Sequence, residues 1–294
     1  MTDMVMFPRP KKRISRASIA ILAFLIMAAL FFCVPLYVLV VTSVKSMDQI
    51  REGAIFALPR GITFEAWDHA WNKACSGMNC TGLKGGFLNS VLITVPSLIV
   101  SIALAMVTGY ALAIWNVRWT GPFLFLLFVC AFVPFQIIMY PLIILTRESG
   151  IYGTRWAVVA IHTVLALPVL TLIFRNYYQD VPPDILKAAI IDSGNFWRIF
   201  AEIILPMSGN ILIVVAILQI TSIWNDYLIG VTFGGLGNMP MTVNLANMVT
   251  VSTGTAAYNV DMAAALLTAL PPLVIYFLLG KFFVQGIAAG AVKG

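Results

Sequence analysis

Six long apolar runs constrain this chain more than any other feature of its sequence. They lie near residues 18–41, 88–114, 122–145, 156–174, 210–232 and 260–283. A run of about 18 or more apolar residues can cross the hydrocarbon core of a bilayer as a helix, because a helix pairs its backbone N–H and C=O groups within the segment. The sequence therefore predicts an all-α, polytopic membrane protein with about six transmembrane helices.

Composition argues against a soluble globular domain. Hydrophobic residues make up 61% of the chain and charged residues only 10%, whereas ordinary soluble domains contain about 25% charged residues. Too few polar side chains are present to cover the surface that a soluble core of this size would expose to water. The bilayer is therefore expected to be the solvent for most of that surface.

Basic residues gather before the first apolar run and indicate the orientation of the chain. They are Arg9, Lys11, Lys12, Arg13 and Arg16, and the net charge of the chain is +6. Positive charge is retained on the cytoplasmic side of a membrane, so this cluster predicts a cytoplasmic N-terminus rather than a nucleic-acid site. With an even number of spans the C-terminus is predicted to be cytoplasmic too, and the loops near 42–87, 146–155 and 233–259 to be external.

A secretory signal peptide is an alternative interpretation of this N-terminus. Its apolar core would cover about 7–15 residues and end at a small-residue cleavage site. The run at 18–41 is longer and no A-x-A sequence ends it. It is therefore expected to remain in the membrane as the first helix.

The predicted organisation has four segments. A basic cytoplasmic N-terminus covers residues 1–17, and the first transmembrane helix with a large periplasmic loop covers 18–87. A transmembrane core covers 88–284 and includes a cytoplasmic loop at 175–209, and a cytoplasmic tail covers 285–294. These boundaries follow the hydropathy of the runs and the charge of the segments that connect them.

The four cysteines fall into two groups. Cys33 and Cys130 lie in apolar runs, where a free thiol behaves as a small hydrophobe. Cys75 and Cys80 lie in the first external loop, where an oxidising compartment favours a disulfide; a reduced structural pair is the alternative. No zinc site is expected there, because His69 is the only further ligand nearby.

The longest cytoplasmic loop has the pattern of two short helices joined at a glycine. Pro182 and Pro183 followed by Asp184 form a helix start, because proline fixes φ and the carboxylate favours the positive end of the helix dipole. Gly194 ends this helix, and a second amphipathic stretch continues to Pro206. Two short, partly apolar helices outside the bilayer favour docking into a groove of a partner protein; a linker lying on lipid headgroups is the alternative.

The order of residues in this loop resembles the coupling motif of membrane subunits of binding-protein-dependent ABC importers, which is written E-A-A-x-x-x-G and is followed by I-x-L-P. The matching positions are Lys187, Ala188, Ala189, Asp192, Ser193, Gly194, Leu205 and Pro206. Two of them depart from the pattern. Lys187 occupies the usual Glu position, and Ser193-Gly194 stands where Gly-Ala is typical, which bears on an ion pair with the ATPase but not on docking.

Further features resemble the second, six-helix subunit of the maltose-type carbohydrate permeases. They are the sequence Trp224-Asn225-Asp226-Tyr227 in the fifth apolar run and the C-terminal tail from Phe283 to Gly294. Within that group, the cysteine-bearing loop and the stretch from Tyr258 to Met262 look most like permeases for glucose, mannose or an α-glucoside.

The resemblance implies a permease subunit of the bacterial inner membrane that forms half of the translocation pathway for a sugar. It implies as partners a second permease subunit in a heterodimer, two ATP-binding cassette subunits, a periplasmic sugar-binding protein and membrane lipid, and no nucleic acid. The chain is expected not to be an enzyme and to hold no cofactor of its own, because it lacks the G-x-x-x-x-G-K-[ST] loop. ATP and Mg would be bound by the partner ATPase.

Polar residues within the apolar runs are candidates for the translocation pathway. The candidates are Trp224, Asn225, Asp226 and Tyr227. Asp226 is the only acidic residue well inside a predicted span, and such a residue either lines a pore or bonds to a neighbouring helix. His162 is interpreted as a residue that bonds between helices.

Two other function classes compete with the importer. A secondary transporter driven by an ion gradient would place paired charges near the bilayer midplane and broken helices in symmetric halves, yet apart from Asp226 no carboxylate is placed at the membrane centre. A membrane-embedded enzyme would need a catalytic or metal-binding cluster, and the sequence shows none. The importer is therefore the preferred hypothesis.

Overall fold

The computed structural model describes residues 16–291 except 78, 116–117, 193 and 251–255. The basic segment before Arg16, the motif residue Ser193 and the last three residues of the tail lie outside the described residues. In the described part the chain is helical and forms no strand, which confirms the all-α prediction.

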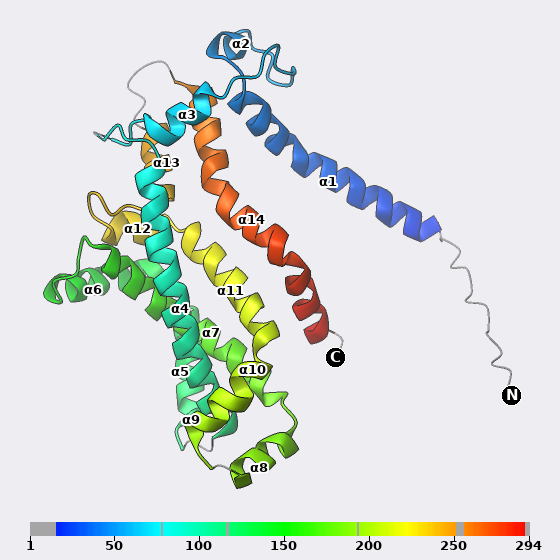
Figure 1. The fold of residues 1–294 in the computed structure, drawn as a ribbon, viewed down its shortest axis with the longest axis vertical. Coiled ribbons are helices and arrows are strands. Elements are labelled where there is room, and N and C mark those ends of the chain that lie inside the picture. The colour runs from blue at the N-terminus through cyan, green and yellow to red at the C-terminus, as the bar shows by residue number, and fades with distance from the viewer. Residues whose placement is uncertain (1–15, 78, 116–117, 193, 251–255, 292–294) are drawn as a thin grey trace, which may run out of the picture.

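The helices follow one another in the order shown in Figure 1. They are α1 (Arg16–Ser43), α2 (Met47–Arg51), α3 (Glu65–Asn72), α4 (Lys84–Ile114), α5 (Thr120–Ala131), α6 (Phe135–Glu148), α7 (Arg155–Gln179), α8 (Pro183–Asp192), α9 (Phe196–Ile199), the π-helix η1 (Phe200–Ile204), α10 (Leu205–Met207), α11 (Gly209–Trp224), α12 (Leu228–Phe233), α13 (Met241–Thr250) and α14 (Tyr258–Ala291).

Four of these helices are long and apolar enough to cross a membrane without interruption, namely α1, α4, α7 and α14. Two further spans are broken. The pair α5 and α6 bends by 101°, and the stretch Phe196–Met207 meets α11 at 77°. Counting each bent pair as one span gives up to 6 spans among the described residues, in line with the predicted number.

The expectation of one continuous helix at 122–145 is wrong. The helix stops at Ala131 and restarts at Phe135. Pro134 has no N–H to donate to a preceding turn, and its ring disfavours the helical conformation at Val133. The hydropathy of residues 122–145 does not reveal this break, because hydropathy does not depend on backbone hydrogen bonds.

The expectation of one continuous helix at 210–232 is also wrong. α11 ends at Trp224, and α12 begins at Leu228 after a gap of three residues. The carboxylate of Asp226 accepts a hydrogen bond from the backbone N–H of Gly230 at 3.0 Å. It thereby supports the start of a new helix in place of the continuation of the old one.

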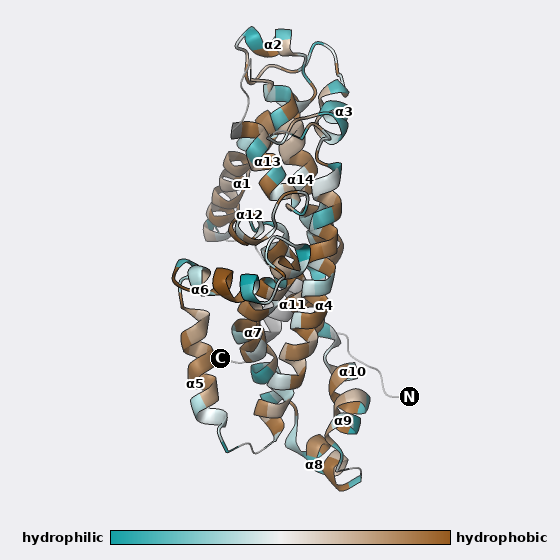
Figure 2. Ribbon diagram, turned by 90° about the vertical axis from the view of Figure 1, so that its left-hand side faces the viewer, coloured by the Kyte–Doolittle hydropathy of each residue, from teal (hydrophilic) through white to brown (hydrophobic). Residues whose placement is uncertain are grey.

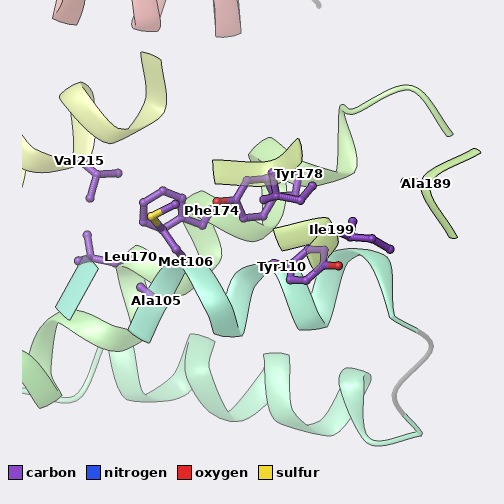
Figure 3. Close-up of a cluster of buried hydrophobic side chains, with 10 residues drawn as sticks. Ala105, Met106, Tyr110, Leu170, Phe174, Tyr178, Ala189, Ile199 and Val215 are labelled. Atoms are coloured by element: carbon purple, nitrogen blue, oxygen red, sulfur yellow. The ribbon is translucent and has the colours of Figure 1, made fainter. Parts of the chain in front are cut away.

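The core of the bundle is the long contact between α4 and α7. A Cβ atom at Gly109 would lie 2.8 Å from the Cβ of Phe174 and 2.9 Å from the nitrogen of Arg175, so only glycine permits this approach of the two helices. Figure 3 shows Met106 of α4 beside Phe174 of α7. The bundle is therefore held together by close backbone contact and ring packing.

Large apolar side chains cover the outside of the bundle. In α1 only the last three residues, Val41–Ser43, are buried, and α5 buries none of its residues. Figure 2 shows both helices as predominantly hydrophobic. Such a surface is stable only in contact with lipid or another subunit.

The molecule has two distinct ends (Figure 1). The end formed by α2, α3 and α13 is called the α3 end below. The opposite end, formed by α8 and α9, is called the α8 end. The two candidate sites are the α8 end itself and the break between α11 and α12.

Candidate functional site: the elbow and the helix break

Residues 182–206 form a bent helical element at the α8 end, here called the elbow. α8 begins at Pro183 with Asp184 in its first turn, as the sequence predicts. The turn that follows has Gly194 at φ +57°, a left-handed conformation that an L side chain adopts only at a cost of about 1–2 kcal/mol. Asn195 then caps the next helix, because its side-chain oxygen accepts from the N–H groups of Trp197 at 2.9 Å and Arg198 at 3.2 Å.

The second arm of the elbow widens into the π-helix η1 directly before Pro206. A proline lacks the N–H that an α-turn would use, and a π-turn changes the bonding pattern of the backbone at that place. Arg198 and Glu202 form an exposed ion pair on this arm, with Nε and Oε1 3.1 Å apart. The arm then meets α11 at Ser208.

Hydroxyl groups of three tyrosines tie the root of the elbow to the core. Tyr110 of α4 donates to the carbonyl of Phe196 at 3.3 Å, and Tyr177 of α7 donates to the carbonyl of Met207 at 2.8 Å. Tyr178 shares a hydrogen bond of 3.0 Å with the hydroxyl of Ser208. These bonds connect the elbow directly to the ends of α4 and α7.

The outward surface of the elbow is apolar and exposed. Ile191 is 84% exposed and Trp197 is 63% exposed, whereas Ala189, Ile199 and Ile204 are buried against the core. The two alanines of the motif therefore face opposite ways, since Ala188 is exposed. The exposed residues provide a contact surface, and the buried ones hold it in place.

Lys187, which stands at the usual Glu position, has its Nζ 3.8 Å from Oδ1 of Asp184. Both side chains are largely exposed, and such pairs contribute about 0–1 kcal/mol to stability.

A cavity of about 410 Å³ separates α8 from the ends of α4 and α7 and is lined by Ile114, Tyr178 and Leu186 among others.

The second site is the gap at residues 225–227, here called the helix break. Asp226 connects it to three helices. Its carboxylate accepts from Gly230 of α12, its carbonyl accepts from the hydroxyl of Thr242 in α13 at 2.6 Å, and its Oδ2 lies 3.7 Å from Nε2 of His162 in α7. The structure therefore places Asp226 in a bent connection rather than inside a continuous span.

Trp224 is buried at 4% exposure, and its indole Nε1–H donates to the carbonyl of Thr268 in α14 at 2.9 Å. Pro272, four residues after Thr268, has no N–H to occupy that carbonyl, so the indole replaces the missing donor. Sequence analysis missed this bond, although the two consecutive prolines in the last apolar run were a signal for it.

The four residues of this motif thus occupy different surroundings. Trp224 packs in the core against the ring of Phe87, with centroids 5.8 Å apart. Asp226 is partly buried, and Asn225 and Tyr227 are exposed. Of the four, only Asn225 and Tyr227 therefore present largely exposed side chains.

A cysteine-closed loop lies at the α3 end. The structure joins Cys75 and Cys80 in a disulfide, and the hydroxyl of Ser76 donates to the side-chain oxygen of Asn244 in α13 at 3.4 Å. Nearby, a hydrogen bond from Lys73 lowers the pKa of the Asp68 carboxyl. Within the described ranges, no group of three or more His, Cys, Asp or Glu could hold a metal ion.

Comparison with known proteins gives a family. Residues 85–289 match the model of the binding-protein-dependent transport system inner membrane component. The chain is 41% identical over 164 residues to a probable ABC transporter permease of Pyrococcus horikoshii. The aligned region covers 55% of this chain and 59% of that relative. It is 34% identical to the osmoprotective compounds uptake permease GgtD of Synechocystis, over 74% of this chain and 72% of the relative.

Two further comparisons support the same family. The α-glucoside transport system permease AglG of Rhizobium meliloti is 31% identical over 74% of this chain and 58% of its own length. Among solved structures, a bacterial ABC transporter involved in the import of the acidic polysaccharide alginate superimposes with a TM-score of 0.76 at 19% identity, covering 94% of this chain and 100% of that chain.

The fold is therefore that of a membrane subunit of an ABC transporter. The chain belongs to the family of inner membrane components of binding-protein-dependent transport systems. This assignment confirms the ABC-importer permease hypothesis, and the alternative of an ion-driven secondary transporter is not supported.

Proposed function

We propose that this chain forms half of the translocation pathway of an ATP-driven sugar importer and that its elbow seats in a separate ATP-hydrolysing subunit. The observation that carries the proposal is the elbow itself, a bent element at the α8 end that exposes Ile191 and Trp197 while its root is bonded to α4 and α7. An exposed apolar helix face of this kind suits a groove on a partner.

In this proposal the complete transporter contains a second permease subunit, two ATP-binding cassette subunits and a binding protein. ATP and Mg are bound by the cassette subunits, since this sequence has no phosphate-binding loop. Nucleotide then biases an equilibrium between two states of the permease pair, because the elbow makes different contacts in each. The hydrogen bonds of Tyr110, Tyr177 and Tyr178 link a change in the position of the elbow to the ends of α4 and α7.

The α8 end faces the cytoplasm in this proposal, and the α3 end faces outward. The orientation is supported by the basic segment before α1, which favours retention inside, and by the disulfide at the α3 end, which favours an oxidising compartment. The binding protein accordingly approaches the α3 end.

The pathway runs past the helix break. Asn225 and Tyr227 offer exposed polar groups there, and Asp226 fixes the direction of α12 by accepting the N–H of Gly230. Trp224 acts by packing, because its side chain is buried. The sugar class is that of glucose, mannose or an α-glucoside, supported by the likeness to an α-glucoside permease.

The test is to place a charge on the exposed surface of the elbow. Ile191→Asp is expected to abolish co-purification of the ATPase and ATP-dependent uptake, because a carboxylate cannot enter an apolar groove without desolvation cost. Leu236→Asp is the matched control, since Leu236 is 87% exposed in the loop between α12 and α13. Retention of the ATPase by both variants would contradict the proposal, as would uptake that survives ATP depletion.

A further inference from the structure

The segment 54–64, here called the apolar loop, exposes large hydrophobic side chains although it belongs to no spanning helix. Its side chains Ile55, Phe56, Leu58, Ile62 and Phe64 are between 58% and 72% exposed. A cluster of this kind marks an interaction site, because it would be costly in contact with water alone.

The loop is held in a defined shape by the end of α1. Lys45 is only 3% exposed, and its ammonium donates to the carbonyls of Ala54 at 3.1 Å and Ile55 at 3.5 Å. The backbone N–H of Thr63 donates to the carbonyl of Val44 at 3.0 Å. Both ends of the loop are therefore fastened next to the last turn of α1, so the exposed side chains are presented by a built structure.

One further bond fastens the middle of the loop to α1. The hydroxyl of Tyr37 donates to the carbonyl of Phe56 at 2.8 Å. Tyr37 lies six residues before Ser43, the last residue of α1, which is about 9 Å at a rise of 1.5 Å per residue. The loop is thus bonded to the end of a spanning helix, and Figure 1 shows the segment after α2 next to that end of α1.

The surface of α1 continues into the loop. Leu36 and Val40 of α1 are 56% and 49% exposed and lie at the level of Tyr37. These α1 residues belong to a helix that crosses the membrane. The apolar loop is bonded to the end of this helix and is likewise exposed, so the apolar surface of α1 continues into it.

We propose that the apolar loop is a lipid anchor that inserts into the bilayer leaflet at the α3 end. Its aliphatic and aromatic side chains occupy the acyl-chain boundary, and Arg60, which is paired with Glu52 at 3.0 Å, lies near the headgroups. The anchor also fixes the start of α14, because Asn259 donates to the carbonyl of Lys45 at 3.1 Å. The outer ends of α1 and α14 are thereby kept at one depth while the elbow moves.

The experiment measures the surroundings of the loop with a spin label in the assembled transporter. Cys33 and Cys130 are first replaced by serine, and single cysteines are introduced as Leu58→Cys, Leu36→Cys or Asp48→Cys. Leu36 provides the lipid-facing reference, and Asp48, whose side chain is 92% exposed in the polar helix α2, provides the water-facing one. Each protein is reconstituted in vesicles of phosphatidylethanolamine and phosphatidylglycerol, and relaxation by oxygen and by a water-soluble nickel chelate is compared.

The expected result is that position 58 behaves like position 36, with relaxation dominated by oxygen and several-fold less access for the nickel chelate than at position 48. Access for the nickel chelate equal to that at position 48 would overturn the proposal. Exclusion of both relaxants would overturn it too, because it would show a protein partner covering the loop. Ile62→Cys repeats the measurement at an independent position that is 68% exposed.

Discussion

The elbow and the helix break differ in what surrounds them. The elbow exposes apolar side chains, and its exposed ion pairs, such as that between Lys187 and Asp184, are weak. At the helix break Trp224 is buried, and Asp226 accepts hydrogen bonds from Gly230 of α12 and Thr242 of α13. The comparison teaches that the elbow presents an apolar surface to its surroundings, whereas the helix break is held in shape by polar bonds between helices.

The largest expected effect comes from straining the backbone of the turn at Gly194 in the elbow. Gly194→Val forces a β-branched residue into φ +57° and is expected to reduce ATPase co-purification and uptake by at least about tenfold, since the two arms can no longer keep their angle. Co-purification from solubilised membranes is the measurement.

Gly237→Val is the matched control, because Gly237 has φ +82° and open space around it. It carries the same backbone strain at a loop far along the chain from the elbow. An equal loss of the ATPase in both variants would mean that strain alone is responsible and would break the contrast between the two regions.

A smaller but still large effect is expected at the helix break. Asp226→Ala leaves the N–H of Gly230 without its side-chain acceptor and removes the carboxylate that lies 3.7 Å from Nε2 of His162; an unpaired buried donor costs about 1–3 kcal/mol. Uptake velocity is expected to fall while the ATPase still co-purifies. Asp226→Asn keeps an oxygen for Gly230 and should restore part of the velocity, and an equally inactive Asn variant would show that the charge itself is required.

The bond between Trp224 and Thr268 predicts a moderate change of stability. Trp224→Phe removes the donor and is expected to lower the free energy of unfolding by about 1–3 kcal/mol, read as a reduced Tm in detergent. In the double variant with Pro272→Ala, the alanine N–H can occupy the freed carbonyl. A coupling energy of zero between the two substitutions would show that the indole of Trp224 does not replace the donor that Pro272 lacks.

The smallest effect is expected at Lys187. Lys187→Glu restores the residue typical of the motif but places two carboxylates at spacing i, i+3 with Asp184. The helix should lose no more than about 0.5 kcal/mol. A weaker dependence of ATPase binding on salt would show that Lys187 makes an ion pair with the partner, and unchanged binding would limit the contact to the apolar surface.

Much of this architecture could be predicted from local sequence. The elbow was predictable because its signals, the Pro182-Pro183-Asp184 start, Gly194 and Pro206, act on neighbouring backbone. The helix break was not, because hydropathy treats residues 210–232 as one apolar run. Only the positions of Gly230, Thr242 and His162 around Asp226 decide that the helix stops there.

The apolar loop illustrates the same limit. Its side chains are visible in the sequence, but their placement beside α1 depends on the bond between Tyr37 and Phe56, two residues that are 19 positions apart. From the sequence, this large loop was predicted only to be external and to carry a cysteine pair.

The sequence by itself determined that this chain is a helical membrane protein with about six spans and an elbow between its fourth and fifth apolar runs, because hydropathy, proline and glycine act locally. Tertiary structure alone decided that Trp224 satisfies the carbonyl of Thr268 and that Asp226 joins three helices, whereas the bend between α5 and α6 follows from Pro134 in the local sequence. The physical reason is that a polar group in apolar surroundings must find a partner, and that partner comes from a distant part of the chain.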